Sequence, residues 1–315
     1  MTRAAIAALV CGLAFLLAGC ASTPEEDVDA YDERFPVLTA ALKKNGDPDS
    51  LAAAAIIRLG EDAGEGLALA RKATDSAPDR ADLAWLALSM CIDEQLCDPQ
   101  PLEARLRALD PANGAAWLGS VTRAFQAKRS DRLAASLEGM AATDHVYTYW
   151  MPLLRRLIPA VERANRIASV DVSAAVTGGI AVHALPVYQA ITQACKAETP
   201  GAPAMLEACR RVAGSLSRGD TYLTELMGLG MQRKLWPADS PQVAAALEAR
   251  RVANYQMTVA GELDGSGESL PPVAEYLRSI ESCETEQQCF KMRISRAGQS
   301  VDPPVGWVGP VESPQ

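Results

Sequence analysis

Apolar residues recur along this chain at the spacing of amphipathic helices, and the alternation typical of strands is not sustained. Alanine and leucine dominate the apolar positions, and proline or glycine interrupts the pattern at intervals that suit helical hairpins. The sequence therefore predicts an all-α fold. The expected helices span residues 31–44, 48–59, 62–76, 80–92, 99–109, 113–128, 130–141, 146–168, 172–184, 187–198, 203–217, 220–235, 239–260, 271–281 and 285–297.

A period of about 33 residues runs through part of this helical pattern. Trp85 and Trp117 are 32 residues apart, Trp117 and Trp150 are 33 apart, and Pro78 and Pro111 are also 33 apart. A fixed period in this range is a sequence signature of repeat architectures.

The segment Leu109–Leu118 resembles the junction between tetratricopeptide repeats, where a helix ends in a proline turn and the next helix opens toward a tryptophan. The resemblance implies helical hairpins stacked as a solenoid with a concave face over residues 31–168. Residues 169–297 are expected to form a further helical region, either a more degenerate array or a separate domain. His145 replaces the proline of the third unit, and an irregular helical bundle is the alternative.

The N-terminus has the features of an export signal. Arg3 precedes fourteen uncharged residues from Ala4 to Leu17, a run shorter than the ~20 residues that a permanent membrane-spanning helix needs. Leu17-Ala18-Gly19-Cys20 resembles the lipobox of bacterial lipoproteins at all four positions. The resemblance implies that residues 1–19 are a signal peptide and that Cys20 is lipidated. The alternative is an ordinary signal peptide with a cysteine placed by chance.

Lipid on Cys20 would anchor the chain to a membrane, because two or more acyl chains bind a bilayer durably. The resemblance implies diacylglycerol and a third, amide-linked chain, with palmitate among the fatty acids. Residues 20–30 are rich in acidic and small residues and are expected to form a flexible tether. Ala21 follows the cysteine in place of the aspartate that retains many lipoproteins in the inner membrane, so we expect the outer membrane, facing the periplasm.

Composition narrows the classes of partner. The chain of 315 residues carries a formal net charge of -9, and removal of Arg3 with the signal would make the charge one unit more negative. An acidic surface argues against nucleic acid, which needs a basic face, and against adhesion to anionic headgroups. The expected partners are the membrane, through Cys20, and an envelope protein.

Six cysteines remain after Cys11, which lies in the signal, and Cys20. An even number in an oxidising compartment predicts disulfides, and the spacing favours three neighbouring pairs. The expected pairs are Cys91 with Cys97, Cys195 with Cys209, and Cys283 with Cys289. Zinc is the competing interpretation, but structural zinc sites favour two to four residues between paired cysteines. Each pair also falls where a helix is expected to break.

The search for chemistry predicts no catalytic residue, cofactor or metal site. The chain lacks a Gly-x-Ser-x-Gly elbow, a phosphate-binding glycine loop and a His-Glu-x-x-His helix, and it has only two histidines. His183, on an apolar segment, is expected to be a core residue. Asp264 and Glu275 occupy the first and twelfth positions of a calcium loop, but Ser269 replaces its glycine. Residues 298–315 are expected to form an extended tail, pinned by Trp307.

One motif favours an enzyme. Residues 228–232, Gly-Leu-Gly-Met-Gln, resemble a motif of lytic transglycosylases, which cleave peptidoglycan. The catalytic glutamate of that family lies about twenty residues earlier and precedes a serine, whereas Glu207 precedes Ala208, and Glu225 does not fit the spacing. The leading hypothesis is therefore a non-catalytic binding or scaffold module that holds a protein partner on its concave face. A peptidoglycan-acting enzyme is the alternative, and a structural lipoprotein without a dedicated site is a third.

Overall fold

The computed structural model describes residues 28–94, 96–164, 185–196, 203–265 and 280–309. All regular secondary structure in these ranges is helical, which confirms the all-α prediction. The elements are α2 (Val28–Asn45), α3 (Pro48–Leu59), α4 (Ala63–Ser76), α5 (Ala81–Glu94), α6 (Gln100–Leu109), η1 (Gly114–Trp117), α7 (Leu118–Gln126), α8 (Ser130–Ala141), α9 (Trp150–Ala164), α11 (Leu185–Ala194), α12 (Pro203–Leu216), α13 (Tyr222–Leu235), α14 (Pro241–Gly265) and α16 (Glu286–Arg296).

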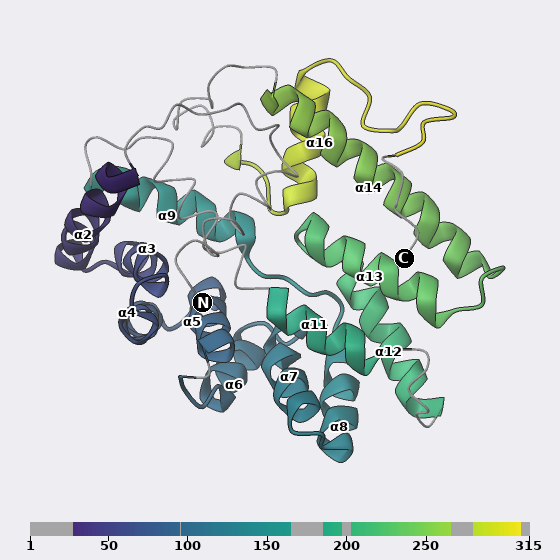
Figure 1. Ribbon diagram of the computed structural model, residues 1–315, viewed down its shortest axis with the longest axis horizontal. Coiled ribbons are helices and arrows are strands. Elements are labelled where there is room, and N and C mark those ends of the chain that lie inside the picture. The colour runs from purple at the N-terminus through teal and green to yellow at the C-terminus, as the bar shows by residue number, and fades with distance from the viewer. Residues whose placement is uncertain (1–27, 95, 165–184, 197–202, 266–279, 310–315) are drawn as a thin grey trace.

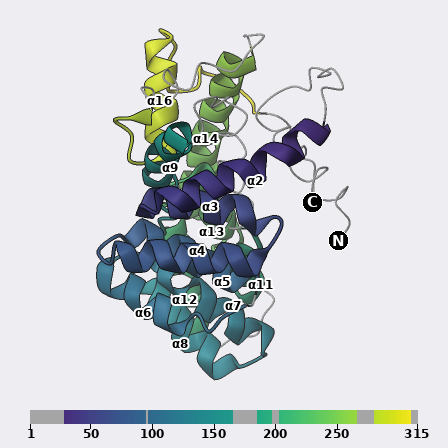
Figure 2. The same cartoon turned by 90° about the vertical axis from the view of Figure 1, so that its left-hand side faces the viewer.

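Most helices pack on the next one along the chain, and together they follow an arc (Figure 1). Helices α2, α3 and α4 form successive layers at one end (Figure 2). The arc continues through α5, α6, α7 and α8, and α12 then packs on α8 and is followed by α13, α14 and α16. Helices α9 and α11 depart from this order. Helix α9 packs on α2, α3 and α5, and α11 packs on α7 and α5.

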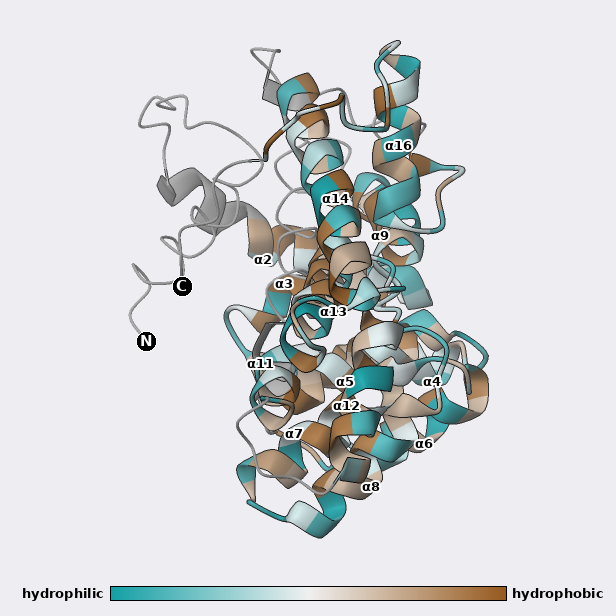
Figure 3. Cartoon of the chain, turned by 90° about the vertical axis from the view of Figure 1, so that its right-hand side faces the viewer, coloured by the Kyte–Doolittle hydropathy of each residue, from teal (hydrophilic) through white to brown (hydrophobic). Residues whose placement is uncertain are grey.

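Helix α9 has two apolar stripes, and each enters a different cluster of buried side chains. The stripe in the large cluster, shared with α3 and α5, consists of Leu153, Leu157 and Val161. The stripe in the small cluster, shared with α16 and the turn before it, consists of Met151, Leu154 and Ile158. Helix α9 therefore joins the first hairpin of the arc to its last helix. Helix α14, by contrast, interleaves brown and teal positions along its length, as a surface helix does (Figure 3).

Side-chain caps explain where several helices begin. The carboxylate of Asp47 accepts from the backbone N–H of Ser50 at 3.0 Å at the start of α3. Thr285 caps α16 by accepting from the N–H of Gln288 at 3.3 Å, and Gln288 in turn accepts from the N–H of Glu284 at 2.9 Å. Such caps satisfy N–H groups that have no partner within the helix. They are readable in the sequence, which is why most predicted boundaries agree with the structure.

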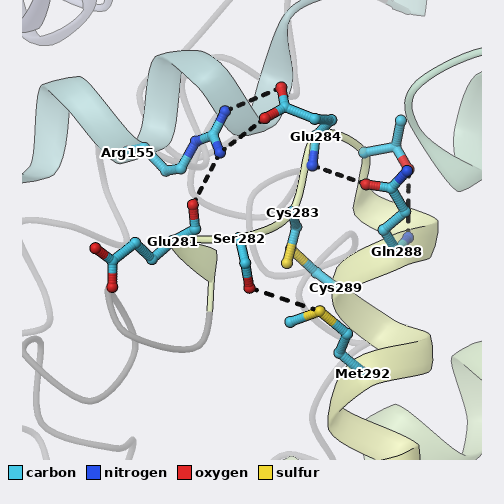
Figure 4. Close-up of a disulfide and its surroundings, with 9 residues drawn as sticks. Arg155, Glu281, Ser282, Cys283, Glu284, Gln288, Cys289 and Met292 are labelled. Carbon is cyan, nitrogen blue, oxygen red and sulfur yellow. Dashed lines mark hydrogen bonds and ion pairs between the residues drawn. A yellow bond between two sulfur atoms is a disulfide. The ribbon is translucent and has the colours of Figure 1, made fainter.

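The three expected disulfides are present, so these cysteines are not zinc ligands. Cys91–Cys97 joins the end of α5 to the turn before α6, and Cys195–Cys209 joins α11 to α12. Cys283–Cys289 closes the turn before α16 onto its first turn (Figure 4), with Cα atoms 5.3 Å apart. Beside it, Arg155 of α9 forms an ion pair with Glu284 at 3.2 Å. The last disulfide is possible because the chain breaks before Thr285, as the sequence predicts.

Five predicted helices differ from the structure. Helix α2 begins at Val28, inside the segment 20–30 that the sequence predicts to be a flexible tether, and α11 spans Leu185–Ala194 and ends four residues before the predicted end at 198. Helix α9 begins at Trp150 and not at residue 146, because residues 145–148 do not form a helix and Tyr149 has a positive φ. The helix expected over 113–128 divides into η1 and α7, and α14 continues past residue 260 to Gly265. The predicted helix over 172–184, His183, Glu275, the domain boundary near 169, the signal peptide and Cys20 lie outside the described residues.

The tail follows α16 in an ordered course along α14. The side chain of Gln256 donates to the carbonyl oxygen of Val301 at 3.0 Å. The ring of Trp307 packs edge-on against Tyr255, with the ring centroids 5.2 Å apart. Trp307 therefore pins the described part of the tail, as the sequence predicts.

Candidate functional site

The segment between α8 and α9, residues 144–149, takes part in a network of polar contacts with residues distant in the sequence; we call it the strap. Its side chains alternate between two sides, as in any extended chain. Val146 and Thr148 are buried, whereas His145, Tyr147 and Tyr149 are half-buried. The strap connects α8 to α9 and makes contacts with both halves of the chain.

Buried Asn113 holds the strap on the side of the first half. Its side-chain oxygen accepts from the N–H of Tyr147 at 2.9 Å, and its Nδ2 donates to the carbonyl of Tyr147 at 3.0 Å. The N–H of Gly114 donates to the carbonyl of His145 at 2.8 Å. A side chain at Gly114 would not fit, because a Cβ there would lie 2.7 Å from the Thr143 hydroxyl oxygen. These contacts give the strap the partners that a strand neighbour would supply.

Tyr149 ends the strap in a left-handed conformation, with φ of 57°, which is uncommon for a bulky residue. Its hydroxyl donates to Asp110 at 2.6 Å and accepts from Asn113 at 3.0 Å. Burial and the neighbouring Asp110 carboxylate raise the pKa of Tyr149 well above its ordinary value. His145 Nε2 lies 3.9 Å from Asp110, and its ring centroid is 4.0 Å from that of Tyr147. These hydrogen bonds stabilise the unusual backbone at the start of α9.

Buried Asp220 holds the strap on the side of the second half. Its carboxylate accepts from the N–H of Thr148 at 2.8 Å, from the Thr148 hydroxyl at 3.1 Å, and from the N–H of Trp150 at 3.2 Å. Asp220 therefore caps α9 from a position 70 residues further along the chain. Burial raises the pKa of Asp220, and the hydrogen bonds from Thr148 and Trp150 oppose that rise.

Two further carboxyl groups lie at the neighbouring helix starts, and we call Asp220, Glu225 and Glu286 together the carboxyl joint. The N–H of Glu286 donates to the carbonyl of Asp220 at 2.9 Å, and Glu286 Oε2 accepts from the N–H of Tyr222 at 2.7 Å. The side chain of Gln287 donates to Glu225 at 2.9 Å. The first turns of α13 and α16 therefore cap each other.

The pKa values of all three carboxyl groups in the joint are raised above their ordinary values. Burial, together with the charges of Asp220 and Glu225, raises the pKa of Glu286 to about 7. Burial also raises the pKa of Glu225. Asp220 and Glu286 accept from backbone N–H groups at helix starts and so cap helices, whereas Glu225 accepts from the side chain of Gln287. Within the joint, Glu286 is the group whose pKa lies near neutral pH, so it can bind and release a proton there.

The transglycosylase-like motif lies where α13 crosses α12. A Cβ on Gly228 would lie 2.2 Å from the backbone nitrogen of Ser217, so the glycine allows the two helices to approach. Gln232 donates to the Ser217 hydroxyl at 3.0 Å. Glu207 is exposed on α12 with Arg210 3.9 Å away, while Glu225 belongs to the carboxyl joint. Helix packing therefore accounts for Gly228 and Gln232.

The three periodic tryptophans have different surroundings. Trp85 is buried in α5 at 3% exposure. Trp117 is half-buried, with the Arg107 guanidinium 4.6 Å from its ring centroid and Gly139 against its far edge. Trp150 begins α9 and packs against both apolar clusters. Their common spacing therefore does not correspond to a common environment.

The sequence did not predict the strap, Asp220 and Glu286 as a connected site. A signal for the strap was present, because His-Val-Tyr-Thr-Tyr alternates polar or aromatic residues with β-branched ones over residues 145–149. Asp220 stands just before the Thr221 cap of α13, and Glu286 just after the Thr285 cap of α16. Their contacts across the fold had no local signal.

The described residues also bear on two other classes of site. No helix among them combines the length and apolarity needed to cross a membrane. No cluster of three or more His, Cys, Asp or Glu side chains in these ranges could hold a metal ion. Comparison with protein-family models, with curated proteins and with solved structures finds no match for this chain.

Proposed function

We propose that this protein is a non-catalytic scaffold of the bacterial cell envelope, anchored by lipid on Cys20 and binding a protein partner through a helical-repeat surface. The lipobox-like residues 17–20 support the anchor, and the acidic residues that precede α2 at Val28 support a body held just off the membrane. We place it at the outer membrane, facing the periplasm. The stacking of successive helices around the arc supports a tetratricopeptide-like solenoid.

One observation supports a fixed scaffold most directly: α9 and α11 cover the face formed by α3, α5 and α7. The buried side chains of α9 are Met151, Leu153, Leu154, Leu157, Ile158, Ala160 and Val161. Burial of each large apolar side chain contributes ~1.5 to 3 kcal/mol. Their sum far exceeds the ~1 to 3 kcal/mol that commonly couples a ligand to a conformational change.

A partner is therefore not expected to displace α9. It would instead bind to a surface that α9 does not cover. The sequence favours a concave face, but that face is filled by the chain itself. We propose the outward side of α4 and α6, where Ala68 and Ala104 are exposed between charged residues. Interfaces that bind transiently are often no more apolar than the remaining surface, so polar residues do not argue against this face.

Site-specific photo-cross-linking in the native envelope tests this proposal. A photoreactive residue at Ala68 or Ala104 should give one discrete cross-linked protein product, and the same residue at exposed Ala245 of α14 should not. Products of equal yield from all three positions, or none, would contradict the proposed surface. A peptidoglycan zymogram of the purified chain should show no clearing, and clearing would favour the enzyme.

A further inference from the structure

The carboxyl joint connects three helix starts that are distant in the sequence. Asp220 caps α9 through Thr148 and Trp150, and its own carbonyl accepts from the N–H of Glu286 at the start of α16. Glu286 in return caps α13 by accepting from Tyr222. Loss of any one of these contacts would weaken the attachment of one helix to the other two.

The groups that face the joint come from every neighbouring element. The strap contributes Tyr147 and Tyr149, both near Asp220, and Asp110 lies beyond them. Helix α11 contributes Tyr188, whose hydroxyl lies 2.9 Å from that of Thr224.

The remaining groups belong to α13, α14 and α16. Tyr222 donates its hydroxyl hydrogen to uncharged Gln256 of α14 at 2.7 Å. Lys291 of α16 acts on Glu225 and favours its ionised form. Arg155 and Glu284 pair with each other beside the turn before α16 (Figure 4). The charges that act on Glu286 itself are negative, from Asp220 and Glu225.

We propose that the carboxyl joint is a proton-operated latch: protonated Glu286 keeps the first turns of α13 and α16 together, and ionised Glu286 loosens them. Protonation leaves the contact with Tyr222 intact, because the proton can occupy Oε1 while Oε2 accepts from the N–H. Ionisation adds a negative charge beside two other carboxyl groups in a partly buried position, where such repulsion is weakly screened.

The direction of the effect follows from the acidity of Glu286. Its pKa is about 7 in the folded chain and 4.5 as the ordinary value. Because the pKa of Glu286 is raised in the folded chain, this group makes a contribution to folding stability that is fully present below pH 4.5 and is lost as the pH rises through 7. The pKa values of Asp220 and Glu225 are raised as well, so their effects have the same sign. The latch is therefore closed under mild acid and loosened by alkali.

Hydrogen exchange of the purified full chain, corrected for the intrinsic pH dependence of exchange, tests the latch. Amides in the first turns of α13 and α16 should lose protection about 30-fold between about pH 5.5 and 8.5, if the open state has the ordinary pKa. Glu286→Gln cannot ionise and should reduce this dependence to the part that Asp220 and Glu225 contribute. Glu284→Gln, at the exposed neighbouring carboxylate, should leave it unchanged.

Two results would overturn the latch. One is protection in the wild-type chain that does not change with pH; the other is a pH dependence that is as large in Glu286→Gln as in the wild-type chain. Carboxyl-detected NMR titration of the wild-type chain provides a test that does not depend on any variant folding. A Glu286 carboxyl that titrates near 4.5 would remove the basis of the proposal.

Discussion

Replacement of a leucine by alanine in either apolar stripe of α9 should destabilise both ends of the arc. Leu157 lies in the large cluster with α3 and α5, and Leu154 lies in the small cluster with α16. Both side chains are fully buried. Leu→Ala changes at such sites cost about 3 to 5 kcal/mol, because the lost apolar contact is joined by the cost of a cavity. That loss is a large part of the ~5 to 15 kcal/mol that stabilises a typical domain.

Urea unfolding followed by hydrogen exchange shows where the loss is felt. Leu154→Ala should lower protection in α3 as well as in α16, because one rigid helix carries both stripes. Leu157→Ala should lower protection in the same two helices, but with the larger loss in α3 and the smaller loss in α16. Leu247→Ala, at a side chain of α14 that is 46% exposed, is the matched control and should change stability by less than ~0.5 kcal/mol. Confinement of each loss to its own cluster would refute the view that α9 joins the two ends.

Three further changes test individual contacts by urea or thermal unfolding. Trp85→Ala should cost ~3 to 5 kcal/mol, and more than Trp117→Ala because Trp117 is already half-exposed; the reverse order would favour the periodic alignment of the tryptophans. Gly228→Ala should cost at least ~1 kcal/mol, since its Cβ has no room against α12; a neutral result would mean that the two helices separate easily. Replacement of Cys283 and Cys289 by serine should lower the free energy of unfolding by ~2 kcal/mol, as loop entropy predicts for a short loop. An unchanged unfolding midpoint would show that this disulfide adds nothing to stability.

Local signals in the sequence were sufficient for the helices and the disulfides. The caps at Asp47 and Thr285 rely on hydrogen bonds that span three residues, so residue type and spacing reveal them. The pair Cys283–Cys289 required a helix break between apolar segments, and Thr285 with Gln288 supplied the signal for it. Such features depend on neighbouring residues and not on the rest of the fold.

Long-range contacts determined what the sequence did not predict. The residues of the strap lie beside a helical pattern, and contacts with residues distant in the sequence, Asn113 and Asp220 among them, hold them in place. The position of α9 inside the arc has the same origin. Its two stripes, at Leu153–Leu157 and Leu154–Ile158, predict a helix buried on two sides but do not identify its neighbours. Tertiary context outweighed local propensity in both cases.

The motif at residues 228–232 shows that a local sequence pattern can also be misleading about function. Its glycine and glutamine resemble an enzyme signature, yet in this fold Gly228 allows close helix packing and Gln232 bonds to the neighbouring helix. The carboxyl group with the acidity suited to a general acid is instead Glu286. It lies in α16, outside any motif that the sequence offered.

Intact mass spectrometry of the protein extracted from bacterial envelopes tests the central claim most directly. The proposed function predicts a chain that begins at Cys20 and carries the mass of a diacylglyceryl group and an amide-linked acyl chain on that residue. Cys20→Ala should abolish the added mass and leave an unprocessed or mis-sorted precursor. A membrane-bound chain that retains Met1, or that begins at Cys20 without lipid, would contradict the claim.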